Sequence, residues 1–475
     1  MTRVRPNAHL ARVGALVVAA AMVAAVVLVA GRAAPTATRH VVRPHPFAAG
    51  HVLGASLQNP PDTATCLVLL HRACYEPKQF RTAYDLQPLY DRGLTGAGRT
   101  IVIVDSFGSP TIREDLHVFD QHYGLPDPQL DIITPAGPIP PYDPRAFGGD
   151  MQGWAVETTL DVEMAHVIAP GARILLVETP TDETQGVQGF PEMMAAENFV
   201  IDNNLGDVIS QSFGATENTF PDFATGAGSL LNLRGAFKNA YRHNVTVLAA
   251  SGDTGSTNYD FNFDLYTMQV NSWPSSDPLV TSIGGTQMHL DANGNRLKPD
   301  ETWNDGRGAS GGGPSHVFGR PEFQDGVAGV VGESRGTPDI SMSAAVDGGA
   351  IVYYTTPVSR FGPWHVLGGT SEASPIFAGI VAIAAQLAGH RLGNINERLY
   401  ELGHESDQSG IVDVTIGDND LGPFKNSDHK TYHVPGFSAL PGYDMATGLG
   451  TIDAAQFIPA LAGEPLPELS GDKQG

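Results

Sequence analysis

A serine at the end of a glycine-rich turn is the first residue of this sequence whose surroundings suggest chemistry. Ser371 stands in the octet Gly368–Pro375, directly before the apolar stretch Ile376–Leu387. A hydroxyl at the start of a helix lies beside backbone N–H groups that have no helical partner, which is what a nucleophile with an oxyanion site needs. A Gly-Thr-Ser sequence is also common as a plain helix N-cap, so the motif alone leaves both interpretations open.

Two carboxylates stand four residues apart in the segment Gly153–His166. Glu157 and Asp161 therefore share one face of a predicted helix. With no Lys or Arg close in the sequence, two adjacent like charges raise one pKa and share a proton. An isolated Glu-x-x-x-Asp is more often part of a solvated acidic face. The pair indicates a catalytic site only in combination with a nucleophile.

A third candidate, Asp253, directly follows the predicted strand Val245–Ala250 and is flanked by glycines. An aspartate at the carboxyl end of a buried strand faces the edge where ligands gather in α/β sheets. By itself it is equally well explained as a turn residue.

These three elements together resemble the sedolisin family, the serine-carboxyl peptidases. The motifs that carry the resemblance are Glu157-x-x-Leu-Asp161, Ser251-Gly-Asp253 and Gly369-Thr-Ser371-x-x-x-Pro375, and the similarity covers about Pro77 to Phe457. Further segments fit the family: Ser210–Gly214, Glu217, Trp273-Pro274, Ile283–Thr286, Ser310–Gly313 and Pro338-Asp339.

The resemblance implies a catalytic set and a substrate-lining segment. Ser371 is the expected nucleophile, Glu157 its general base and acid, Asp161 the residue that orients Glu157, and Asp253 the oxyanion donor. The residues expected to bind substrate are Ser210, Ser212, Phe213 and Gly214.

A histidine base of the subtilisin type is not predicted, because no His-Gly-Thr turn exists. His166 lies near the end of its helix and is interpreted as structural, as is Asp105 at the end of the strand Ile101–Val104. In acid a histidine is protonated and useless as a base, whereas a carboxylate still accepts a proton. Asp253 can donate a hydrogen bond only while protonated, so the expected activity is acidic.

The resemblance also implies one calcium ion near the C-terminus. The expected ligands are the carboxylates of Asp413 and Asp444 with the carbonyls of Val414, Leu440 and Gly442, and calcium takes six to eight such oxygens. Leu440 departs from the glycine usual in the family, which affects backbone freedom and not the ligand type. An acidic loop without metal is the alternative.

The strands and helices that must position these residues are predicted to form a subtilisin-like α/β fold, with a mostly parallel central sheet and helices on both faces. The predicted strands are Thr100–Asp105, Arg173–Glu178, Asp207–Ser210, Val245–Ala250, Leu279–Ile283 and Ala350–Tyr354. The predicted helices are Trp154–Val167, Glu192–Asp202 and Leu230–Arg242.

Composition narrows the class of protein further. The 475 residues are 41% hydrophobic and only 17% charged, which excludes a chain kept disordered by its charge. The net charge of −23 argues against nucleic acid as a partner, since phosphate binding needs concentrated Lys and Arg. Protein or peptide substrates and a monomeric state are expected instead.

The N-terminus indicates export. Arg3, Arg5 and Arg12 precede the apolar run Val13–Gly31 and a small-residue segment, the order of a secretory signal, so a secreted, extracellular location is expected. An uncleaved N-terminal membrane anchor, with the enzyme facing outside, is the alternative. In an exported protein Cys66 and Cys74 are expected to form one disulfide.

The predicted organisation is a signal peptide or anchor over 1–34, a linker or short pre-region over 35–76, a sedolisin-like peptidase domain over 77–465 and a tail over 466–475. The pre-region is too short for the large propeptide of sedolisins. That keeps a second interpretation open, a protein-binding pseudoenzyme on the same fold. A glycoside hydrolase using Glu157 and Asp161 is a third, but it leaves the Ser371 motif unexplained.

Overall fold

The computed structural model describes residues 60–146, 150–356, 362–405 and 409–467, all within one compact unit that extends over Val41–Gly475. The apolar run Val13–Gly31 and the predicted signal lie outside the described residues. Among the described helices, only α11 (Thr370–Ala388) is long and apolar enough to cross a membrane, and most of it is buried in the protein core.

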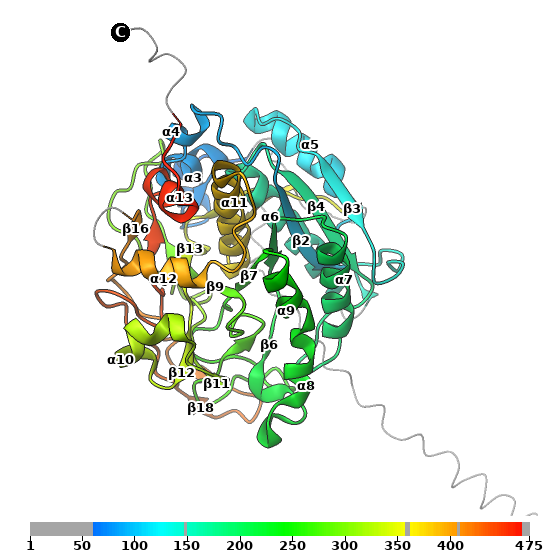
Figure 1. Cartoon of the computed structure of the whole chain (residues 1–475), viewed down its shortest axis with the longest axis vertical. Coiled ribbons are helices and arrows are strands. Elements are labelled where there is room, and N and C mark those ends of the chain that lie inside the picture. The colour runs from blue at the N-terminus through cyan, green and yellow to red at the C-terminus, as the bar shows by residue number, and fades with distance from the viewer. Residues whose placement is uncertain (1–59, 147–149, 357–361, 406–408, 468–475) are drawn as a thin grey trace, which may run out of the picture. The chain divides into compact units, whose positions relative to one another are not determined.

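The central sheet has eight strands, in the order β10-β9-β7-β5-β2-β4-β3 with β13 also paired to β9 (Figure 1). All neighbours are parallel except the antiparallel pair of β10 and β9. The bounds are β2 Thr100–Ser106, β3 Leu130–Ile133, β4 Arg173–Thr179, β5 Val208–Gln211, β7 Thr246–Ala250, β9 Thr281–Gln287, β10 Glu301–Thr302 and β13 Ile340–Ser343.

Alternation along β2 shows how the sheet separates two cores. Ile101 and Ile103 belong to one buried cluster with residues of α6 (Asp150–Ile168) and α11, whereas Val102 and Val104 belong to another with residues of α7 (Phe190–Asp202) and α9 (Gly235–Arg242). Successive strand residues point to opposite faces, so a run of β-branched residues is buried on both. The predicted sheet with helices on both faces is confirmed.

Helices α6 and α11 pack closely because Gly379 lies at their crossing. A Cβ atom on Gly379 would lie 2.7 Å from Cβ of Ile168, closer than side-chain atoms tolerate. Both helices are therefore held tightly under the sheet, and each carries candidate catalytic residues.

The remaining elements surround this body. The other helices are α2 Thr63–Leu69, α3 Pro77–Ala83, α4 Gln87–Tyr90, α5 Ile112–Tyr123, α8 Gly228–Leu231, α10 Ala328–Val331, α12 Asn396–His404 and α13 Ala454–Ala462. The small sheets pair β1 Cys74–Tyr75 with β14 Gly349–Tyr353 and β15 Trp364–Leu367, β6 Ala215–Thr216 with β8 Ser272–Trp273, β11 Gly313–Gly319 with β12 Ser334–Thr337, β16 Ile411–Val412 with β19 Thr451–Ile452, and β17 Phe424–Lys425 with β18 Thr431–Tyr432.

Three expectations need adjustment. The predicted strand Ala350–Tyr354 exists as β14, but it lies in a separate three-stranded sheet. The predicted helix Leu230–Arg242 is divided by a 3₁₀ turn over Asn232–Arg234. Residues 60–76 are part of the folded body and not a linker, because β1 pairs with β14.

The disulfide between Cys66 and Cys74 is present, as expected. Both cysteines are buried, and they join α2 to β1. The segment before Pro77 is thus fixed to the domain by a covalent bond as well as by strand pairing.

Candidate active site

Ser371 is the second residue of α11 and is 5% exposed. The chain enters the helix through Gly369, whose φ of 118° lies in the region that side chains rarely adopt. This turn sets the serine at the positive end of a 19-residue helix, where the first N–H groups have no helical acceptor. The site can therefore stabilise negative charge that develops next to the hydroxyl.

Glu157 and Asp161 occupy one face of α6, and both are fully buried. Burial is the main cause that raises the pKa of Glu157 well above its ordinary value, and the facing Ser371 hydroxyl opposes it by favouring the charged form. Neither Glu157 oxygen has a well-aligned hydrogen bond within the described part of the chain, so the contact with Ser371 is loose. Contacts of this kind commonly tighten only when substrate binds.

In the described part of the structure, no cation acts on the pKa of Asp161. Burial first, and then the charges of Asp105 and Glu157, raise its pKa well above the ordinary value, while the Ser212 hydroxyl favours the charged form. Two carboxyl groups in such proximity cannot both ionise easily, so the pair shares a proton.

Asp105 belongs to the same cluster, which the sequence did not indicate. It is fully buried at the end of β2, and burial raises its pKa to about 7. Its charge in turn raises the pKa of both Glu157 and Asp161. The interpretation of Asp105 as purely structural is therefore incomplete. The sequence feature that could have indicated its place in the cluster is its position at the carboxyl end of a central strand.

Asp253 is fixed against the first residue of α11. Thr370 donates both its backbone N–H and its hydroxyl to Oδ1 of Asp253, each at 2.8 Å, and its Oγ accepts the N–H of Gly252 at 3.1 Å. Burial raises the pKa of Asp253 to about 7. Its charge also raises the pKa of Glu157, so the structure brings Asp253, Glu157 and Ser371 into one site.

The four residues expected to bind substrate are placed differently from one another. Ser210 is fully buried within β5, and its Oγ lies 2.8 Å from Oγ of Ser374 on α11, so its side chain holds the sheet to the helix. Phe213 packs its ring against Phe190. Ser212 contacts the Asp161 carboxyl. Gly214 is the most accessible to solvent of the four residues.

His166 is fully buried and pairs with Asp120, with Nε2 and Oδ1 3.2 Å apart. No contact joins it to Ser371 among the described residues. The interpretation of His166 as structural agrees with this pairing, and the side chain that faces the Ser371 hydroxyl is the carboxyl group of Glu157.

The residues expected at a calcium ion meet at one loop. Asp413 Oδ2 accepts the N–H of Gly442 at 2.9 Å, and Asp444 Oδ2 accepts the N–H of Leu440 at 2.9 Å. The described residues contain no group of three or more His, Cys, Asp or Glu side chains suited to a metal. An ion here would take most of its ligands from carbonyls such as that of Val414, a donor type that calcium accepts. By donor type, then, the loop fits calcium.

Comparison with known proteins gives the family. The model of the subtilase family matches residues 147–394. Kumamolisin from Bacillus sp. (strain MN-32) is 31% identical over 399 residues, which cover 82% of this chain and 63% of that protein. Sedolisin from Pseudomonas sp. (strain 101) is 30% identical over 392 residues, 80% of this chain and 60% of that protein.

A more distant relative is tripeptidyl-peptidase 1 of Mus musculus, 28% identical over 62% of this chain and 50% of that protein. Among solved structures, Pseudomonas sedolisin in complex with two molecules of pseudo-iodotyrostatin matches with a TM-score of 0.65 and 27% identity, covering 82% of this chain and 99% of that one. The chain thus spans about 60% of the length of kumamolisin and sedolisin.

Proposed function

Since the chain belongs to the subtilase family, and within it to the sedolisins, we propose that it is an exported, acid-acting serine-carboxyl peptidase that hydrolyses peptide bonds through an acyl-enzyme on Ser371. The observation that carries this proposal is the Ser371 hydroxyl facing Glu157 within a group of buried carboxyls. The expected substrates are proteins or peptides. Since the relatives include both sedolisin and a tripeptidyl-peptidase, the choice between internal and tripeptide-by-tripeptide cleavage stays open.

In the proposed first step Glu157 accepts the Ser371 proton while Oγ forms a bond to the peptide carbonyl carbon. The carbonyl oxygen becomes an oxyanion beside the N-terminus of α11. Glu157 then gives the proton to the leaving amine, the C–N bond breaks and the acyl-enzyme forms. Water completes the cycle, with Glu157 again taking and returning the proton.

Asp161 supports this transfer by sharing a proton with Glu157. When Asp161 holds the proton, Glu157 is the anion that can act as base. Asp105 adds a third carboxyl whose charge acts on both. This arrangement needs a protonated partner, which is available only while the pH stays below the raised pKa values.

Asp253 is the proposed oxyanion donor, and Thr370 decides which of its oxygens can donate. Oδ1 already accepts two hydrogen bonds from Thr370. The proton of the neutral acid must therefore reside on Oδ2, which is the oxygen left to donate to the substrate. With the pKa raised to about 7, this proton is present in acid and lost as the pH rises past neutrality.

We also propose that one calcium ion binds at the loop of Asp413 and Asp444. The ion would be held by the two carboxylates and by carbonyls of Val414, Leu440 and Gly442, far from any bond-making step. Its role would be to stabilise the folded C-terminal segment.

The test is digestion of an unstructured protein between about pH 3 and 7 by wild type and Ser371→Ala, with products read by mass spectrometry. Wild type should cleave best in acid and the variant should be inactive. Tripeptides released in succession would indicate a tripeptidyl-peptidase, and internal fragments an endopeptidase. Equal activity of the two proteins would reject the proposal, and a maximum near pH 8 would reject the carboxylate mechanism.

A further inference from the structure

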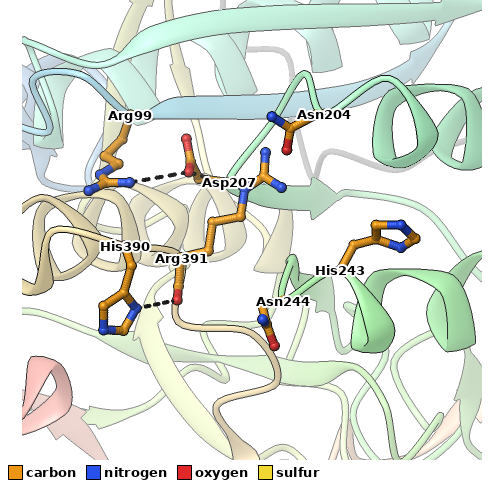
Figure 2. Close-up of a pocket in the computed structure, with 7 residues that line it drawn as sticks. All are labelled: Arg99, Asn204, Asp207, His243, Asn244, His390 and Arg391. Atoms are coloured by element: carbon orange, nitrogen blue, oxygen red, sulfur yellow. Dashed lines mark hydrogen bonds and ion pairs between the residues drawn. The ribbon is translucent and has the colours of Figure 1, made fainter.

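A hollow of about 440 Å³ lies at the amino ends of the central strands. Seven polar residues line it, as Figure 2 shows: Arg99, Asn204, Asp207, His243, Asn244, His390 and Arg391. Ser371 begins α11, and His390 and Arg391 follow the end of the same helix. At 1.5 Å per residue the helix separates the two sites by roughly 28 Å.

The two arginines are held in place by one shared carboxylate. Arg99 Nη1 lies 3.6 Å and Arg391 Nε 3.3 Å from Oδ1 of Asp207. Asp207 is itself fixed, since its Oδ2 accepts the N–H of Thr100 at 2.8 Å. Two guanidinium groups against one carboxylate leave an excess positive charge that is already oriented before any anion arrives.

The two histidines of the hollow each have one ring nitrogen held by a backbone carbonyl. Nδ1 of His390 lies 2.7 Å from the carbonyl oxygen of Arg391, and Nδ1 of His243 lies 3.0 Å from that of Asn239. A carbonyl only accepts, so each Nδ1 carries a hydrogen and Nε2 is the ring nitrogen left for other contacts.

Two arginines around one carboxylate stand out in a chain of net charge −23. Further charged neighbours among the described residues include Arg242, which precedes His243, and Asp202, whose Oδ1 accepts from Asn239 at 2.8 Å. The lining of the hollow therefore holds two fixed cations for one carboxylate.

We propose that this hollow binds an oxyanion of the sulfate or phosphate type, with Arg99 and Arg391 as the fixed cations. Arginine is suited to the task because its planar fork of N–H groups matches such oxyanions. The volume lies within the range of small-molecule sites, so an organic ester of sulfate fits as well as the free ion.

The test is calorimetric titration of the full chain with inorganic sulfate at pH 5, at ionic strength held constant with chloride. Saturable binding is expected, at least about tenfold weaker in Arg391→Gln, as for loss of a hydrogen bond to a charged group. The matched control is Arg145→Gln, which removes a cation that is 91% exposed and does not line the hollow.

Arg99→Gln provides a second variant, which removes the other cation beside Asp207. It should also weaken sulfate binding at pH 5. A parallel titration with glucose 6-sulfate distinguishes the source, because tighter binding than inorganic sulfate indicates an ester and equal binding the free ion. The proposal is overturned if no saturable binding occurs at pH 5, or if Arg391→Gln and Arg145→Gln bind sulfate like wild type. Neither readout depends on peptidase activity.

Discussion

The two edges of the central sheet handle charge in opposite ways. At the carboxyl ends of β2 and β7, Asp105, Asp253 and the α6 pair are buried, and no cation among the described residues shifts the pKa of any of them. At the amino end of β5, which lies between β2 and β7, Asp207 is contacted by two arginines. Aspartate thus retains a proton at the carboxyl ends of the strands and pairs with arginine at the amino ends.

Helix α11 connects these two environments. Its N-terminus, with partial positive charge, lies at Ser371, and its C-terminus, with partial negative charge, lies beside His390 and Arg391. The helix favours an oxyanion at the first edge and cations at the second. A carboxyl edge that relies on protons should respond to pH, whereas a paired carboxylate should respond little.

The largest expected effect is on the carboxyl edge. Glu157→Gln should lower the rate of peptide hydrolysis by roughly four to six orders of magnitude, as Ser371→Ala should, because the two groups act as one unit. Since no cation within the described ranges acts on Glu157, the substitution leaves no buried charge unpaired and the variant should remain folded. The measurement is initial rate on a peptide near pH 4, with the exposed Glu397→Gln as control. Near-normal turnover of Glu157→Gln would place the base elsewhere.

Substitutions of Asp253 test whether catalysis needs a protonated carboxyl group at this position or any hydrogen-bond donor. Asp253→Ala should cost about 10² to 10³ in rate, the size of one oxyanion donor. Asp253→Asn should keep more activity, because Thr370 occupies the accepting oxygen and directs the amide NH₂ to the position of Oδ2.

The pH profile separates these two variants. The alkaline decline of Asp253→Asn should shift upward relative to wild type, since the amide needs no proton. Thr370→Val, which removes one hydrogen bond to Oδ1, should lower the rate less than Asp253→Ala does. Unchanged pH profiles in all three variants would contradict the role of Asp253.

The free energy of unfolding should depend on pH through the buried carboxyl groups. Burial raises the pKa of Glu197 and of Glu372 to about 8, so the folded state holds protons that the unfolded state releases. Stability is then fully present below about pH 4 and falls as the pH rises through 7 to 8. The loss should be on the order of a few kcal/mol, measured as urea midpoints at pH 4, 6 and 8.

Glu197→Gln is the matched variant for this effect, because Glu197 accepts from Gln211 on the adjacent strand β5 and does not contact Ser371. It should flatten part of the pH dependence without altering the chemistry of the site. Stability that rises from pH 4 to 8 in wild type would show that the buried carboxyls do not control it.

The smallest expected effect concerns the carboxylates of the C-terminal loop, where the proposed counter-ion is calcium. A chelator should lower the melting temperature at pH 5, with about 2.7 kcal/mol lost if calcium stood at 100 times its Kd. Asp413→Ala should remove most of this response. Burial raises the pKa of Asp444, so calcium should stabilise less near pH 3. An unchanged melting temperature and no calcium by elemental analysis would refute the site.

Local spacing was sufficient for much of this protein. Helix periodicity placed Glu157 and Asp161 on one face, the β-branched runs predicted β2, β4 and β7, and the Gly-Thr-Ser turn predicted the start of α11. These features depend on residues a few positions apart, whose geometry the backbone dictates. The boundary at Pro77 was wrong because β1 is stabilised by pairing with β14, far along the chain.

Only the tertiary structure decided which distant residues share an environment. Asp105 belongs to the carboxyl cluster because β2 lies near the centre of the strand order, and the side chain of Ser210, a residue expected to bind substrate, meets Ser374 on α11. The hollow at the amino edge combines residues from four separate connections of the chain. The periodicity of the sequence does not encode these contacts between distant residues. They depend on the order in which the parallel strands pair and on where each connecting helix returns the chain to the sheet.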